Sequence, residues 1–278
     1  MIYSRLTVTP SPTATREAVS AALFIAGSEG ILEDGDRLIS VFPDAAVADD
    51  AVREVLTVDA EARIERETFE PGDYDAAWRA GVEPRWVGRL RIAPPWRADE
   101  GDPARTLIIE PGTGFGTGEH ETTRCALLLL QDEVRVGDRV ADLGCGSAVL
   151  AIAAARLGAA RVVAIELDAE AIPNAEENVR LNAAADRVVV IEGDAGALVP
   201  LLAPLDVVVA NIISSVLVQL LPVLRPALAP GGRVVVSGVL VSERAAFLEW
   251  LAVEGWHVAR ETAEGEWWAA VLTTEAAA

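Results

Sequence analysis

The chain has 278 residues, of which 51% are apolar and 24% are charged, a composition typical of a globular protein with a sizeable core. Its formal net charge of −20, with arginine but no lysine, disfavours non-specific nucleic-acid binding, which requires a clustered basic surface. The acidity suits a basic protein partner, although solubility alone also accounts for it. Because no basic stretch precedes a long apolar run near the start, we expect neither a secretory signal nor a membrane span, and hence a cytoplasmic protein.

Residues 1–69 follow the order β-α-β-β-α-β, which is typical of a small α+β ferredoxin-like domain. We expect Phe24, Ile25 and Leu38 in its core and a hairpin turn at residues 33–36. Because no residue here predicts chemistry, we interpret the segment as a recognition domain. The predicted elements are strand Ile2–Val8, helix Thr13–Ala26, strands Gly30–Leu32 and Arg37–Phe42, helix Ala46–Thr57 and strand Ala62–Thr68.

Residues 70–104 interrupt this pattern with several prolines and tryptophans. We predict a linker that packs on the following domain. Trp78 within it could serve either interdomain packing or a substrate surface.

From residue 105 to residue 278, strands alternate with helices, which predicts an α/β domain with a doubly wound parallel sheet. Such a sheet binds its ligand beyond the carboxyl ends of its strands. The predicted strands are Thr106–Ile109, Arg139–Leu143, Arg161–Glu166, Val188–Glu192, Asp206–Ala210, Gly232–Ser237, Trp256–Arg260 and Trp267–Leu272, of which the last two form an antiparallel hairpin. The predicted helices are Thr122–Leu130, Ala148–Leu157, Ala169–Asn182, Ser214–Leu228 and Glu243–Glu254.

The segment from Val140 to Glu166 predicts the nucleotide-binding end of a β-α-β unit. Its strand leads into Gly144 and Gly146, where backbone can approach a ligand, and then into a helix start. Val149 takes the place of the third glycine in the dinucleotide fingerprint, and Asp142 would repel a pyrophosphate but could bind the cationic amino group of a methionine moiety. We therefore predict S-adenosylmethionine as the cofactor, bound by Asp142 and both glycines.

Polar side chains end the next strands of the predicted sheet. Glu166 can hold two ribose hydroxyls, whereas we expect nearby Asp168 to be the N-cap of the following helix. Asp194 could accept the adenine amino group, with an exposed turn aspartate as the alternative. The amide oxygen of Asn211 can orient an amine lone pair toward a transferable methyl group, and its alternative role is to cap the helix from Ser214.

The glycine-rich segment from Glu110 to Thr123 predicts a loop that bends around a ligand or moves as a lid. Thr122 and Thr123 at the following helix start can bind a carboxylate through hydroxyl and N–H groups. We predict His120 as a hydrogen-bonding residue that could also assist catalysis, and further cofactor contacts from Phe115, Gly116 and Thr117. The two cysteines and two histidines lack metal-ligand spacing, so we expect neither a metal site nor a disulfide.

These motifs resemble the ribosomal protein L-eleven methyltransferases, the PrmA family. The first motif below is specific to that family, whereas the second marks methyltransferases in general. The resemblance covers the second domain and the connector, while residues 1–69 agree in layout. The motifs are FGTGEHETT at 115–123, DLGCGS at 142–147, ANI at 210–212 and EGEW at 264–267.

The resemblance implies a seven-stranded, Rossmann-like methyltransferase domain that binds S-adenosylmethionine through Thr123, Gly144, Glu166 and Asn211. It also implies methylation of lysine side chains and the terminal amine of a large-subunit ribosomal protein, bound by the small first domain. Glu166 stands where the family commonly has aspartate, and Ala148 replaces a usual glycine. We expect a monomer, and the alternatives are another amine substrate, a nicotinamide-dependent oxidoreductase and a noncatalytic adaptor.

Overall fold

The computed structural model of the protein describes residues 3–12, 15–28, 30–35, 37–69, 82–111 and 120–274. Contacts between Cα atoms divide the chain into two compact units, residues 1–82 and 83–278. The first unit has its own hydrophobic core, and two further core clusters belong to the second unit. Each unit therefore has the buried apolar surface of an independent domain.

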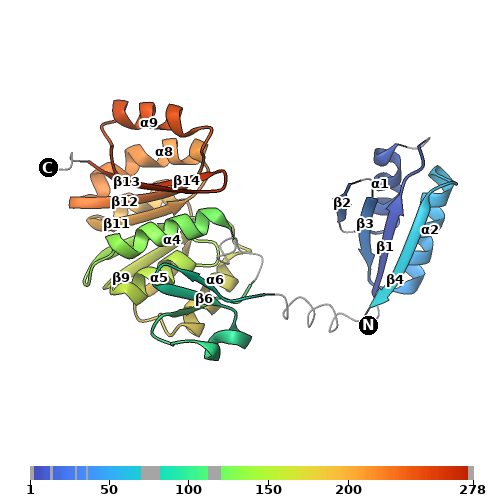
Figure 1. The fold of residues 1–278 in the computed structure, drawn as a ribbon, viewed down its shortest axis with the longest axis horizontal. Coiled ribbons are helices and arrows are strands. Elements are labelled where there is room, and N and C mark those ends of the chain that lie inside the picture. The colour runs from blue at the N-terminus through green and yellow to red at the C-terminus, as the bar shows by residue number, and fades with distance from the viewer. Residues whose placement is uncertain are drawn as a thin grey trace. The chain divides into compact units, whose positions relative to one another are not determined.

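Four strands in the described part of the first unit form an antiparallel sheet in the order β2-β3-β1-β4, with helices α1 and α2 on one face (Figure 1). This arrangement confirms the predicted β-α-β-β-α-β order. Alternate residues of β1, such as Leu6 and Val8, face the helices and are fully buried. The elements are β1 (Tyr3–Thr9), α1 (Arg16–Ile25), β2 (Ile31–Asp34), β3 (Arg37–Phe42), α2 (Ala45–Val58) and β4 (Arg63–Phe69).

The prediction that Phe24 and Ile25 lie in this core is wrong, since they are 53% and 76% exposed, whereas Leu38 is buried as predicted. Helix α1 turns Val19 and Leu23, which are four residues apart, toward the sheet. Residues one and two positions after Leu23 therefore fall on the outer side of the helix.

The segment predicted as a linker contains regular structure from residue 85 onward. Strands β5 (Arg85–Val87) and β6 (Leu90–Ala93) form a hairpin, a 3₁₀ helix follows at Pro95–Glu100, and β6 pairs in parallel with β7 (Thr106–Ile108). The predicted strand Thr106–Ile109 therefore belongs to this separate sheet and not to the main one. The sequence analysis did not predict this small sheet, because its strands are too short to show a periodic pattern and are separated by turn residues.

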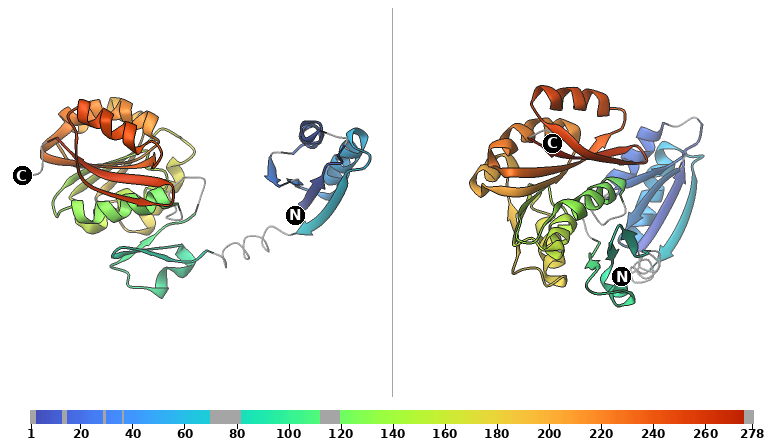
Figure 2. Two further views of the ribbon diagram at one scale, coloured as in Figure 1. Left: turned by 45° about the horizontal axis from the view of Figure 1, so that its top comes forward. Right: turned by 60° about the vertical axis from the view of Figure 1, so that its left-hand side comes forward.

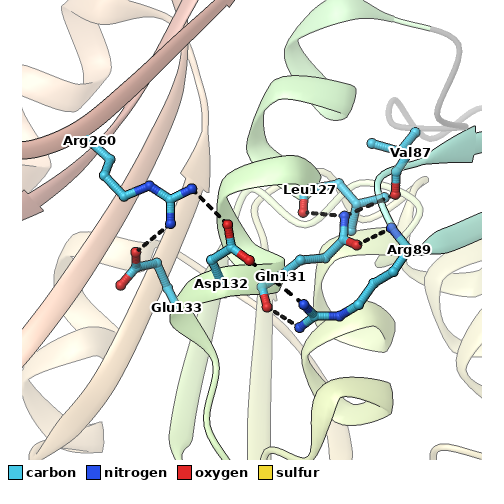
Figure 3. A network of polar contacts seen from close by, with 7 residues as sticks. All are labelled: Val87, Arg89, Leu127, Gln131, Asp132, Glu133 and Arg260. Atoms are coloured by element: carbon cyan, nitrogen blue, oxygen red, sulfur yellow. Dashed lines mark hydrogen bonds and ion pairs between the residues drawn. The ribbon is translucent and has the colours of Figure 1, made fainter.

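A buried glutamine fastens the β5–β6 turn to helix α4 (Glu121–Glu133). Gln131 donates through Nε2 to the carbonyls of Val87 and Leu127, both at 3.0 Å, and accepts from the Arg89 N–H at 2.7 Å (Figure 3). Gly88 in the turn has φ +57°, and a Cβ there would lie 2.8 Å from the Gln131 amide. The hairpin is thus held by a fully hydrogen-bonded buried side chain.

Seven strands of the second unit, all within described residues, form one sheet in the order β10-β9-β8-β11-β12-β14-β13. The first five strands in this order, β10, β9, β8, β11 and β12, run parallel to one another. Strand β14 pairs antiparallel with both β12 and β13. This confirms the predicted doubly wound α/β domain closed by a hairpin. The strands are β8 (Arg139–Leu143), β9 (Arg161–Glu166), β10 (Val188–Glu192), β11 (Leu205–Asn211), β12 (Leu228–Leu240), β13 (His257–Glu264) and β14 (Trp267–Thr273).

Helices cover both faces of this sheet (Figure 1). In β11, Val207 and Val209 join the core beneath α4, α5 and α6, whereas Val208 and Ala210 join the core beneath α7, α8 and α9. Residues 207–210 of β11 are all apolar because their side chains point alternately into the two cores. The remaining helices are α5 (Val149–Leu157), α6 (Ile172–Leu181), α7 (Ala195–Leu202), α8 (Ser214–Leu224) and α9 (Arg244–Val253).

Helix α7 is absent from the sequence prediction, which places no helix between Glu192 and Asp206. Its eight residues include Pro200 and lack a polar face, so no helical periodicity is visible. The helix forms because Asp194 caps it and Val199 is fully buried against the sheet. Within the residues that the structure describes, no helix has both the length and the apolar composition needed to cross a bilayer.

Candidate functional site

The parallel strands bring the predicted polar residues to one edge of the main sheet. Asn211 at the end of β11 pairs with Ser237 of β12, and Glu166 at the end of β9 pairs with Glu192. Gly144 follows β8, whose last residue pairs with Ile165. These residues meet because parallel strands end on the same side of a sheet.

The loop after β8 is built from residues in the left-handed region. Gly144, Gly146 and Ala148 have φ values of +63°, +50° and +63°. The N–H groups of Gly144 and Cys145 both donate to the Ile165 carbonyl, at 2.8 and 3.1 Å, and a Cβ on Gly144 would lie 3.1 Å from the Ile212 side chain. The chain can turn this tightly because glycine adopts such φ values without steric cost, whereas Ala148 bears that cost.

Glu166 fixes this loop to the end of β9. Its carboxylate accepts N–H bonds from Gly146 at 2.8 Å, Leu167 at 2.8 Å and Asp168 at 3.0 Å. The residue is half-buried, so the carboxylate lies at the surface of the sheet edge. The side chain predicted to bind ribose therefore also holds the glycine loop in place.

Asp142 lies beneath the same loop and is only 1% exposed. Its Oδ2 accepts from the Ala151 N–H in the first turn of α5 at 2.9 Å, whereas Oδ1 has no hydrogen-bond partner among the described residues. Burial raises the pKa of this carboxyl to about 7, the Ala151 bond lowers it and the Glu166 carboxylate raises it further. A buried, incompletely satisfied carboxylate fits a cationic ligand group such as an ammonium.

The start of helix α4 packs against the ends of β11 and β12. Asn211 Nδ2 donates to the hydroxyl of Thr123 at 3.3 Å, and the buried Ser237 hydroxyl donates to the Thr122 carbonyl at 2.8 Å. Thr123 is fully buried and Asn211 is half-buried. The structure thus brings together two residues predicted to contact the cofactor. Ser237 was not predicted as a site residue, although a polar residue that follows the apolar run of β12 is a usable signal.

His120 is the N-cap of α4. Its Nδ1 accepts from the Thr122 N–H at 3.3 Å and lies 2.9 Å from the Thr122 hydroxyl. Its ring makes an edge contact with Trp267, with ring centroids 5.3 Å apart. The hydrogen-bonding role predicted for His120 is present, while a part in catalysis stays a prediction.

The β13–β14 hairpin fastens the same helix start. Strands β13 and β14 lie alongside α4 (Figure 2), and Arg124 donates to both carboxylate oxygens of Glu264 at 2.7 to 3.1 Å. This contact raises the pKa of the Arg124 guanidinium above its usual value. The EGEW motif at residues 264–267 therefore contacts the FGTGEHETT motif at His120 through Trp267, and contacts Arg124, the residue directly after that motif, through Glu264.

The two predicted aspartates at the other strand ends accept hydrogen bonds from nearby backbone N–H groups. Asp194 is exposed and its Oδ1 accepts from the Ala197 N–H at 3.1 Å as the N-cap of α7, so an adenine contact stays a prediction. The expectation that Asp168 is the N-cap of the next helix is wrong. Helix α6 begins at Ile172 after Ala171, and Asp168 accepts from the Glu170 N–H at 2.9 Å in the preceding turn. Pro173 in the first helical turn is consistent with this later start.

The predicted contacts from Phe115, Gly116 and Thr117 fall outside the described residues, as does Trp78. The structure describes the chain up to residue 111 and again from His120 onward.

Three asparagines, two in α6 and one at its C-cap, were missed by the sequence prediction and hydrogen-bond to the backbone at Ile108 and Glu110. Asn182 donates to the Ile108 carbonyl at 2.6 Å and accepts from its N–H at 2.9 Å. Asn178 accepts from the Glu110 N–H at 2.8 Å, and Asn174 donates to the Glu110 carbonyl at 3.1 Å. Their spacing of four residues puts them on one helix face, which could have revealed them.

Comparison with known proteins places this geometry in a family. The family model described as Ribosomal protein L11 methyltransferase (PrmA) matches residues 7–275. The ribosomal protein L11 methyltransferase of Thermus thermophilus is 41% identical over 200 residues, which are 71% of this chain and 77% of that protein. That of Gloeobacter violaceus is 38% identical over 217 residues, 78% of this chain and 67% of that protein.

A solved structure agrees with this relationship. The crystal structure of the ribosomal protein L11 methylase from Lactobacillus delbrueckii subsp. bulgaricus has a TM-score of 0.62 and 29% identity, and it covers 69% of this chain and 98% of that chain. The family resemblance predicted from the loop motifs is thereby confirmed. Because the family model spans both units and all the residues of the site, the chain belongs to the ribosomal protein L11 methyltransferase family, PrmA.

Proposed function

We propose that the protein is an S-adenosylmethionine-dependent protein N-methyltransferase that modifies lysine side chains, the terminal amine, or both, of ribosomal protein L11. The observation that carries this proposal is the convergence of Asp142, Glu166, Asn211 and Thr123 at one edge of the sheet. When bound there, S-adenosylmethionine supplies an electrophilic methyl group on a sulfonium.

The residues of the edge match the parts of this cofactor. The unpartnered Oδ1 of Asp142 suits the methionine ammonium, and Glu166 suits the ribose hydroxyls. The N–H and hydroxyl groups at the start of α4, around Thr122 and Thr123, suit the methionine carboxylate. Phe115, Gly116, Thr117 and Asp194 are proposed as further contacts.

Catalysis in this proposal is mainly positioning. A lysine amine with a pKa of about 10.4 must lose its proton before it attacks, and partial burial of the site favours the neutral form. Asn211 Nδ2 is engaged with Thr123, which leaves its amide oxygen as the acceptor that orients the amine. His120 Nδ1 accepts from the Thr122 N–H, so in the neutral ring the other nitrogen, Nε2, carries the hydrogen, and His120 is proposed to help position the substrate at the start of α4.

The first unit, residues 1–69 in the predicted division, is the proposed recognition domain. An acidic chain of net charge −20 attracts a basic ribosomal protein and repels nucleic acid. We further propose that the enzyme works as a monomer in the cytoplasm, where its substrate is made.

A methyl-transfer assay tests the function directly. Purified enzyme with radiolabelled S-adenosylmethionine should label purified L11, and peptide mapping should place the label on amines. Label on a different protein of a ribosomal extract, or on a small amine, would reassign the substrate. Absence of both labelling and S-adenosylhomocysteine binding would reject the methyltransferase assignment, and NAD binding in its place would indicate an oxidoreductase.

The role of Asn211 is tested by Asn211→Ala. We expect kcat to fall about 100-fold, because a preorganised polar group at the reacting centre is lost. The matched control is Gln219→Ala, an exposed amide in the following helix whose Nε2 donates to the Ser215 carbonyl. Full turnover of Asn211→Ala at saturating substrates would remove this residue from the proposed mechanism.

A further inference from the structure

Ser237 is a fully buried serine at the edge of the main sheet that carries the candidate site, and it is the register partner of Asn211. Its side chain lies on the face covered by α4, because Val235, two residues earlier in β12, belongs to the core beneath that helix. Ser237 Oγ donates to the Thr122 carbonyl at 2.8 Å, and Asn211 Nδ2 donates to the Thr123 hydroxyl at 3.3 Å. Two neighbouring strands thus hold two consecutive residues in the first turn of α4.

The backbone around Ser237 is itself closely fitted to the end of β11. The register of β12 with β14 shifts between Val236 and Val239, as at a β-bulge. The Ser237 carbonyl accepts from the Ile212 N–H at 3.0 Å. Gly238 has φ +89°, and a Cβ there would lie 2.7 Å from the Ile212 carbonyl oxygen. The Ser237 hydroxyl therefore stands on a backbone whose position relative to β11 is fixed.

We propose that Ser237 is a positioning residue for methyl transfer, which holds the first turn of α4 where the Thr123 hydroxyl meets the Asn211 amide. With its Nδ2 donating to Thr123, the Asn211 side chain presents its oxygen to the acceptor amine. Without the Ser237 hydroxyl, the helix start loses its shorter hydrogen bond to the sheet edge, and the Asn211 amide loses part of its orientation. This inference rests on the proposed function, because it assumes that Asn211 orients the amine.

The first test compares Ser237→Ala with Thr106→Val. Thr106 is also buried in the second unit, and its hydroxyl donates to the Asp102 carbonyl at 2.8 Å, so each variant removes one hydroxyl-to-carbonyl hydrogen bond. Both should unfold at lower denaturant concentration than the wild type. Under conditions where all proteins are folded, we expect kcat for methylation of L11 to fall about tenfold in Ser237→Ala and to stay near the wild-type value in Thr106→Val.

The ligand used for binding is S-adenosylhomocysteine, which contains no acceptor amine. Its Kd, measured by calorimetric titration, should rise less than about threefold in Ser237→Ala, because the main loss concerns the orientation of Asn211 toward the acceptor. A rise in Kd as large as the fall in kcat would show that Ser237 supports the cofactor site as a whole, and would overturn the proposal.

The second test places Ser237→Ala in the Asn211→Ala background. Because Ser237 is proposed to act through the Asn211 amide, the double variant should have a kcat within about twofold of that of Asn211→Ala. A further tenfold fall in the double variant, or wild-type turnover in either single variant, would overturn the proposal. Failure of the wild-type protein to methylate L11 would instead reject the proposed function.

Discussion

At neutral pH the Asp142 carboxyl is near the midpoint of its titration, because burial raises its pKa to about 7. An aspartate in the unfolded chain titrates near its ordinary value of about 3.9. Between these two pKa values the folded protein holds more protons at this residue than the unfolded protein does. The contribution of Asp142 to the free energy of unfolding therefore falls as pH rises from about 4 to about 7.

The variant Asp142→Asn should reveal this dependence. We expect the difference in unfolding free energy, variant minus wild type, to increase between pH 5 and pH 7 with a slope approaching about 1.4 kcal/mol per pH unit, and to level off above pH 7. Urea denaturation at several pH values measures it, and the other ionisable groups cancel because both proteins carry them. A difference that stays constant with pH would mean that Asp142 is charged throughout this range.

Two alanines with positive φ offer a matched comparison of backbone strain. Ala183 follows α6 with φ +49° and is exposed, whereas Ala148 has φ +63° and is fully buried. Ala183→Gly should raise the free energy of unfolding by about 1 kcal/mol, because it relieves a left-handed alanine without loss of packing. Ala148→Gly should change it less, since relief of strain is offset by the loss of a buried methyl group worth about 0.8 kcal/mol. Chemical denaturation decides, and an equal gain in both variants would contradict the packing argument.

At the scale of elements, the C-terminal hairpin and helix α4 form one unit at the site. Glu264 and Trp267 at the hairpin turn contact Arg124 and His120 in the first turns of α4. The same helix is joined at its other end to the β5–β6 turn through Gln131 (Figure 3). The position of Thr123 therefore depends both on the β5–β6 turn, which precedes α4 in the sequence, and on the β13–β14 hairpin, which follows it.

Glu264→Gln tests this dependence. The exposed ion pair contributes at most about 1 kcal/mol, so the variant should fold, but we expect the KM for S-adenosylmethionine to rise about threefold as the helix start loosens. Glu261→Gln is the control, because Glu261 lies on the same hairpin, in β13, and makes a comparable bidentate pair with Arg244 of α9. Steady-state kinetics should leave the control near the wild-type KM. An equal rise in both variants would show that general loosening of the hairpin is responsible.

At the scale of the whole molecule, the net charge of −20 should act on the encounter with a basic substrate. Raising the salt concentration from 50 to 500 mM shortens the screening length from about 14 to about 4 Å, so the KM for the ribosomal protein should increase severalfold. The KM for S-adenosylmethionine should change less, because its contacts are short-range and partly buried. Kinetics at several salt concentrations measure both constants, and parallel changes would argue against charge-driven recognition.

The sequence by itself determined most of the order of elements, the family and the meeting of several strand-end residues at one edge of the sheet. The β-α-β-β-α-β layout, the alternation after residue 105 and the placement of Gly144, Glu166 and Asn211 at one sheet edge are readable because hydrophobic periodicity and strand-end motifs are local signals. The same locality explains the errors, since α7 lacks a polar face and β5 and β6 are too short to show a period.

Only the tertiary structure decided which polar groups meet. The Asn178 bridge to Ser147 and Glu110, the Ser237 bond to Thr122 and the pairing of Arg124 with Glu264 join residues 31 to 140 positions apart. Such contacts depend on how helices pack over the sheet, and no window of sequence contains both partners. The raised pKa of Asp142 has the same origin, because burial by the surrounding core and not its neighbours in sequence removes the carboxyl from water.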